Sequence, residues 1–163
     1  MCKEVLLGML LTVSRCSLQA QQANEPSANL SADFAKAGLQ AVKAIQRCTG
    51  TMFLDENRLV VPRETRKSVD SAGAAARTDT EKALVGVLND LFLARLNTNM
   101  SRATIMMNGF SPESRERLKK EADADDAITA SESKQRRCAA ALIQIFQTRS
   151  YAAPPKDCKN VAF

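Results

Sequence analysis

The side chains that could do chemistry in this sequence are few, and histidine is absent from them. The chain of 163 residues has no His and five Cys, and its six Gly residues are scattered. Histidine is the commonest general base and metal ligand, and a glycine-rich loop is what cradles phosphates. We therefore expect a protein that is not an enzyme and holds no cofactor. The catalytic alternative that the composition leaves open is a carboxylate- or cysteine-dependent enzyme.

An acidic cluster is the nearest approach to a metal site. It consists of Glu121, Asp123, Asp125 and Asp126, and carboxylate oxygens are the ligands that Ca²⁺ and Mg²⁺ prefer. The EF-hand pattern fails, because the loop glycine is missing and the twelfth position counted from Asp123 is Lys134. On a helix, these side chains would point to different sides of the axis instead of converging. We interpret the cluster as a solvated helix face without a metal.

Arg95 lies near the middle of an apolar stripe when the sequence is plotted at 100° per residue. The stripe has helical spacing and consists of Leu84, Val87, Leu88, Leu91, Phe92 and Leu96. One hypothesis makes Arg95 a buried cation that binds an anionic ligand or an acid on another helix. The interpretation we favour places Arg95 in the last helical turn, where its stem packs on the core and its guanidinium reaches water.

The same stripe and the methionines that follow it could line a groove for an apolar ligand. Methionine is flexible and polarizable, so it adapts to irregular apolar partners. The candidate lining residues are Leu88, Leu91, Phe92, Met106 and Met107. The alternative, which we favour, is that these residues fill the core at a helix end.

Helix starts and stops punctuate most of the chain. Ser31 is a good N-cap for a first helix that ends at Thr49-Gly50. Thr78 and Glu81 have the spacing of a capping box, in which each side chain bonds a free backbone N–H. Ser111, followed by Pro and Glu, is a further helix start.

Strand signals are nearly absent, and this decides the fold class. Residues 51–62 form either a small hairpin or an irregular crossover, and we favour the crossover. Residues 112–137 are very polar and predict an exposed face. We expect an all-α fold, a single bundle of four or five helices over residues 31–149, with a C-terminal tail at 150–163.

The N-terminal stretch predicts an exported protein. Residues 5–13 are an apolar run with the length of a signal-peptide core, too short to span a bilayer. We predict a cleavable N-terminal signal segment at 1–20 and a flexible leader at 21–30, with no stable membrane span after signal removal. The alternative is a buried amphipathic N-terminal helix, and a lipid anchor at Cys16 is disfavoured by Arg15 before it. The expected location is secreted or periplasmic.

Removal of residues 1–20 would leave three cysteines, and an oxidising compartment favours a disulfide between two of them. If the first and last helices run parallel, Cys48 and the tail lie at the same end of the bundle. We therefore predict a disulfide between Cys48 and Cys158, with Cys138 as a buried thiol. The alternative, Cys138–Cys158, needs only the tail to fold back along its own helix.

Composition also limits the partners. The net charge of +5 is mild, basic and acidic residues alternate, and there is no Trp and one Tyr. Nucleic-acid binding calls for a one-sided basic face and groups that stack on bases, so we expect no nucleic acid partner. The first hypothesis for function is a non-catalytic helical protein that acts through contacts with an unknown protein partner. The second is a small carrier that binds an apolar small molecule between its helices.

Overall fold

The computed structural model describes residues 28–50, 53–55, 58–60, 62–107 and 111–161 of the chain. Within these residues it contains five α-helices, which confirms the predicted all-α fold. The helices are α1 (Ala32–Arg47), α2 (Arg63–Ala75), α3 (Asp79–Met107), α4 (Pro112–Ala124) and α5 (Asp126–Thr148). The predicted signal segment, residues 1–20, lies outside the described residues.

Two short antiparallel strand pairs accompany the helices. Strands β2 (Phe53–Asp55) and β3 (Arg58–Val60) pair between α1 and α2, with Leu54 opposite Leu59. The favoured crossover is therefore wrong here, and the hairpin alternative is correct. Strands β1 (Ala28–Asn29) and β4 (Ser150–Tyr151) form the other pair, and a short 3-10 helix, η1 (Lys156–Cys158), follows β4.

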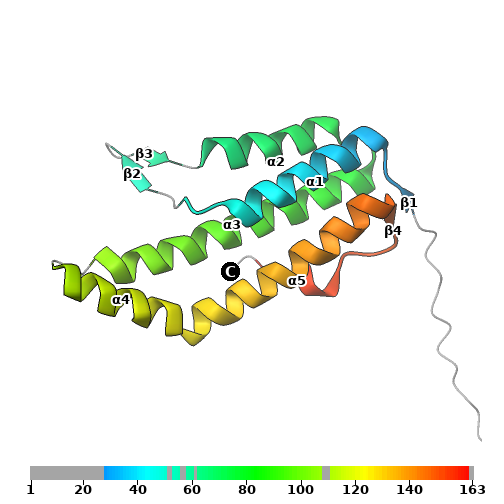
Figure 1. Ribbon diagram of the computed structural model, residues 1–163. Helices are drawn as coiled ribbons and strands as arrows, with labels where there is room; N and C mark the ends of the chain where they lie inside the picture. Colours follow the sequence, from blue (N-terminus) through cyan, green and yellow to red (C-terminus); the bar gives the residue numbers. More distant parts are fainter. Residues whose placement is uncertain (1–27, 51–52, 56–57, 61, 108–110, 162–163) are drawn as a thin grey trace, which may run out of the picture.

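The β1–β4 pair fixes the relative direction of the first and last helices. It places the start of α1 beside the end of α5, as Figure 1 shows, and the Leu30 N–H donates to the Arg149 carbonyl at 2.8 Å. Helices α1 and α5 are therefore antiparallel. Residues 28–30 were predicted as flexible leader, but Leu30 is only 4 % exposed because it packs into the core.

Helices α1 and α5 pack closely at a glycine. The rings of Phe34 and Phe146 meet edge to face, with centroids 5.7 Å apart. A Cβ on Gly38 would lie 2.5 Å from Cζ of Phe146, so a side chain there would have to displace the ring. Gly38 thus lets α1 approach α5, and both phenylalanines belong to the core.

Helices α4 and α5 are two segments of one polar stretch that breaks at Asp125. Its backbone leaves the helical region at ψ 115°, and its carboxylate Oδ1 accepts from the Ile128 N–H at 2.8 Å. An N-terminal cap of this kind starts a new helix with a new direction. Figure 1 shows the resulting bend. Before it, α4 packs along the C-terminal part of α3, and after it α5 runs along the rest of the bundle.

The predicted capping box at the start of α3 is confirmed, and it reaches further than expected. Glu81 Oε2 accepts from the Thr78 N–H at 3.1 Å, and the Glu81 N–H donates to Thr78 Oγ1 at 3.2 Å. The same carboxylate accepts from the Arg77 N–H at 2.7 Å and, through Oε1, from the Ser31 N–H at 2.8 Å. Ser31 occupies the N-cap position of α1, but its side chain makes no cap bond. The glutamate therefore joins the N-terminal ends of α1 and α3.

Burial alone would raise the pKa of Glu81, which is 1 % exposed. The backbone N–H groups of Arg77 and Ser31, with smaller contributions from the Ser31 side chain and Thr78, outweigh burial and lower the pKa to about 2. Hydrogen bonds donated to an ionised carboxylate stabilise the charged form and so lower its pKa.

The predicted Cys48–Cys158 disulfide is wrong. Cys138 on α5 bonds Cys158 in η1, with the two Cα atoms 4.7 Å apart, and Cys48 is a buried free thiol. The prediction assumed that the first and last helices are parallel. Because α1 and α5 are antiparallel, the tail leaves α5 at the end of the bundle opposite to Cys48.

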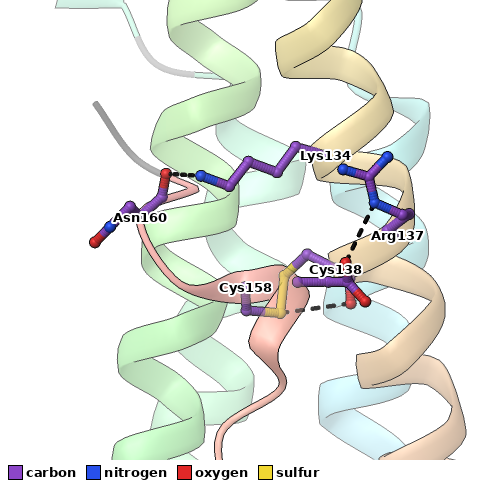
Figure 2. Close-up of a disulfide and its surroundings, with 6 residues drawn as sticks. Lys134, Arg137, Cys138, Cys158 and Asn160 are labelled. Atoms are coloured by element: carbon purple, nitrogen blue, oxygen red, sulfur yellow. Dashed lines mark hydrogen bonds and ion pairs between the residues drawn. A yellow bond between two sulfur atoms is a disulfide. The ribbon is translucent and has the colours of Figure 1, made fainter.

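Polar contacts flank the disulfide and hold the tail along α5 (Figure 2). Arg137 Nε lies 3.2 Å from Asp157 Oδ1, and Lys134 donates to the Asn160 carbonyl. Beyond them, Val161 is 2 % exposed and belongs to the core. The C-terminal segment is thus an integral part of the described fold.

Candidate functional site

A cavity of about 330 Å³ lies between α1, α3 and α5. Its apolar lining comes from one residue of each helix, namely Ile45, Leu91 and Ala139. All three belong to the hydrophobic core cluster and are at most 2 % exposed. The cavity opens to solvent beside Gln46 and Arg136, both of which are exposed. Its volume is at the small end of the range for ligand sites.

The remaining lining residues are polar or charged, and Gln135 is the most buried of them. It is 5 % exposed, and its Nε2 donates to Thr98 Oγ1 at 2.7 Å, to Ser131 Oγ at 3.1 Å and to the Ala94 carbonyl at 3.2 Å. Of these partners, the Ala94 carbonyl can only accept, and it therefore orients the amide with its nitrogen toward α3. Its Oε1 is buried and has no hydrogen-bond partner within the described part of the chain. Leaving such an oxygen unpaired costs about 1–3 kcal/mol.

Two arginines of α3 share one carboxylate of α5 beside the cavity. Arg95 Nη1 lies 3.5 Å from Glu132 Oε1, and Arg102 Nη2 lies 3.2 Å from Glu132 Oε2. Arg102 also pairs with Asp123 of α4. Burial tends to lower the pKa of Arg102, but the hydrogen bonds and charges of Glu132 and Asp123 outweigh it and raise the pKa. The four groups therefore form a charge-balanced cluster that ties α3 to α4 and α5.

Arg95 is positioned by the end of α1 as well as by α5. Its Nε donates to the Cys48 carbonyl at 3.0 Å, and its side chain is 23 % exposed. The favoured interpretation placed Arg95 in the last helical turn with its guanidinium in water. This interpretation is wrong about the position, because α3 continues to Met107. The alternative, in which Arg95 pairs with an acid on another helix, matches the contact with Glu132.

The predicted apolar groove is not assembled. Leu88, Leu91 and Phe92 are at most 1 % exposed and lie inside the bundle, whereas Met107 is 73 % exposed. The side chain of Met106 lies outside the described residues. At about 1.5 Å per residue, Met107 lies roughly 24 Å along the helix from Leu91. Of the predicted set, only Leu91 lines the cavity described above.

The acidic cluster at the α4–α5 junction serves structural contacts. Asp123 pairs with Arg102, Asp125 caps α5, and Glu121 lies 3.7 Å from Arg117 one turn away. Among the described residues, no three Asp, Glu, Cys or His side chains lie close enough together to hold a metal ion.

A second surface feature lies on the side of α3 that faces away from the cavity. Leu93, Met100 and Met107 are 43, 40 and 73 % exposed and follow one another at seven-residue intervals. Seven residues are about 20° short of two helical turns, so these side chains lie almost in line. We call them the α3 stripe. Leu91 and Arg95, which line the cavity, point to the opposite side of the helix.

The sequence prediction missed most of the cavity lining. Glu132, Gln135 and Arg136 fall in the stretch that was expected to be exposed, and Ala139 is too small to be prominent. A signal was nevertheless present in α5. Gln135 and Ala139 continue the inward-facing spacing of Leu142 toward the N-terminal end of the helix.

Within the described residues, none of the helices combines the length and the apolar character needed to cross a membrane. Comparisons of the chain with protein-family models, with curated proteins and with solved structures found no match.

Proposed function

We propose that this chain is a non-catalytic binding protein that holds a small molecule in the cavity between α1, α3 and α5. The observation that carries the proposal is the cavity itself, whose lining combines apolar side chains with the polar side chain of Gln135 and a half-buried arginine, Arg95. Ligand sites typically combine apolar walls with a few convergent polar groups. This lining favours a partly polar ligand over the purely apolar one expected from the sequence.

The cavity volume limits the size of the ligand. At about 30 Å³ per water molecule, 330 Å³ corresponds to roughly eleven waters. A ligand of about ten non-hydrogen atoms fits this space. Small ligands gain about 0.3 to 1 kcal/mol per atom, so about ten atoms give dissociation constants between roughly 50 nM and 6 mM.

Filling the cavity should abolish binding. Ala139→Leu places extra methyl groups into the cavity, whereas Ala140→Leu puts the same side chain on the exposed side of α5. We expect Ala139→Leu to weaken probe binding at least tenfold and Ala140→Leu to change it less than twofold. The probes are cyclohexanecarboxylate, its amide and the corresponding aminomethyl compound. Binding is followed through the backbone amide NMR shifts of Ile45 and Leu91.

Two results would overturn the proposal. One is that no probe shifts these amides at concentrations up to about 10 mM. The other is that a probe binds Ala139→Leu, folded by circular dichroism, as tightly as the unchanged protein. Either result means that the cavity is not a ligand site.

A second candidate function, contact with a protein partner, is favoured by the α3 stripe. Apolar residues at seven-residue intervals supply one of the two positions per heptad that line the seam between two packed helices. A second copy of this chain presents the same seam, so we propose self-association through α3. We expect a dimer in sedimentation equilibrium at 10–500 µM (roughly the range for a weak interface). Leu93→Lys with Met100→Lys should yield monomer, and Ala140→Lys should not. A monomeric unchanged protein over this whole range would exclude self-association through the stripe.

We further propose that the protein works outside the cytoplasm, in a secreted or periplasmic location. The signal-like segment at residues 1–20 supports this proposal, as does the Cys138–Cys158 disulfide, because disulfides persist mainly in oxidising compartments.

A further inference from the structure

Resting on the proposed function, we infer that the ligand of the cavity is a small organic anion with a compact apolar body. The apolar body would lie against Ile45, Leu91 and Ala139, and the anionic group would lie at the open side beside Arg136. The inference comes from the charged residues that line the cavity, where Arg95 pairs with Glu132 and Arg136 forms no ion pair with any residue that the structure describes.

Arg136 is the unbalanced charge. It lines the cavity at its open side, and its guanidinium makes no hydrogen bond or ion pair with any residue that the structure describes. An arginine is a fork of five donors that bonds a carboxylate through two parallel contacts. It is therefore the group at this site that is free to recognise an anion.

Glu132 is the acid that would repel an anion, and its charge is already engaged. Arg95 and Arg102 both bond its carboxylate, at 3.5 and 3.2 Å. Arg95 lines the cavity in addition and adds positive charge to its wall. Among the charged residues that line the cavity, two arginines, Arg95 and Arg136, stand against one acid, Glu132, so the lining itself has a net positive charge.

The size and lining exclude the larger classes of anion. No aromatic side chain lines the cavity within the described residues, so it offers no stacking surface for a base or an extended ring system. The volume accommodates a monocarboxylate with a short aliphatic or alicyclic body.

The test compares three probes with the same ring and different charge. Cyclohexanecarboxylate is anionic, cyclohexanecarboxamide is its neutral isostere, and aminomethylcyclohexane is cationic. With the full-length protein at pH 7 and low salt, we expect the carboxylate to bind at least tenfold more tightly than the amide. This ratio is typical of one charge-assisted contact. The amine should bind more weakly than the amide.

Two variants of Arg136 test whether this arginine causes the preference for the carboxylate over the amide. Arg136→Gln should reduce the carboxylate-to-amide ratio to about threefold or less, because it removes the unpaired cation and leaves the apolar lining intact. Arg136→Lys should retain part of the preference. Arg63→Gln makes the same charge change at an exposed position on α2 that does not line the cavity, and the ratio should stay within twofold of that of the unchanged protein.

The outcomes separate this inference from the proposed function. If the amide binds in the cavity as tightly as the carboxylate, the anion inference is wrong and the binding function stands. If Arg136→Gln retains the full ratio, Arg136 does not recognise the ligand and the inference also fails. If none of the three probes shifts the amides of Ile45 and Leu91, both proposals fail together.

Discussion

Replacing Glu81 by Gln should lower the free energy of unfolding by about 3 kcal/mol at pH 7. The carboxylate accepts hydrogen bonds from the backbone N–H groups of Ser31, Arg77 and Thr78, and it is 1 % exposed. A glutamine places an NH₂ group where an oxygen now accepts, and so leaves at least one buried donor unpaired. A carboxyl pKa lowered from 4.5 to about 2 corresponds to about 3 kcal/mol of stabilisation.

The same group predicts how stability depends on pH. Its pKa is depressed in the folded state, so its contribution is fully present above the unfolded value of 4.5 and is lost as the pH falls toward 2. The difference in unfolding free energy between the unchanged protein and Glu81→Gln should therefore shrink by about 2 kcal/mol between pH 7 and pH 3. Urea denaturation at the two pH values measures it.

Glu64→Gln is the matched control, since Glu64 is an exposed acid in the first turn of α2. Its effect should stay within about 0.5 kcal/mol at both pH values. A Glu81→Gln difference that is equally large at pH 3 and pH 7 would show that the carboxylate charge is not what stabilises the two helix ends.

Glu81 also shows what the sequence could and could not predict. The Thr78–Glu81 spacing lies within one turn, so the capping box is visible in the sequence and is confirmed. The bond to Ser31 joins residues 50 positions apart, and no local pattern reports it. Ser31 was predicted to cap α1, but its side chain makes no cap bond, and its own backbone N–H donates to the Glu81 carboxylate of α3.

The cavity illustrates the same limit. Arg95 stood out in the sequence as a charge in an apolar stripe, yet its partner Glu132 lies on α5 and is reached only through the packing of the two helices. The α4–α5 bend at Asp125 decides where Glu132 and Arg136 fall. Apolar periodicity predicted the helices and the buried positions of Leu88 and Phe92, whereas the polar lining depends on helix directions that periodicity does not encode.

The disulfide prediction failed for a reason of this kind. Cys48 and Cys138 both face inward, so their spacing within each helix does not distinguish them as partners for Cys158. The choice depends on whether α1 and α5 are parallel, and the β1–β4 pair makes them antiparallel. The alternative pairing needs no such assumption, because the tail simply returns along its own helix.

Removing the Cys138–Cys158 bond should lower the free energy of unfolding by about 3 kcal/mol. The bond closes a loop with a sequence separation of 20, and loop-closure entropy for such a length gives about this value. Cys158→Ala should show the loss in urea denaturation under oxidising conditions. It should also increase proteolysis near Val161, which is now buried beside the bond.

Cys48→Ala is the matched control, since it also removes a buried cysteine but breaks no disulfide. Cys48→Ala should lower the free energy of unfolding by about 1 kcal/mol, and adding a reducing agent should lower the stability of this variant further. Cys158→Ala should be insensitive to the reductant, because no bond remains to be cleaved. A protein whose reductant sensitivity disappears in Cys48→Ala and persists in Cys158→Ala would place Cys48 in the bond and refute the Cys138–Cys158 pairing. Reductant sensitivity therefore tests the pairing independently of the size of the stability change.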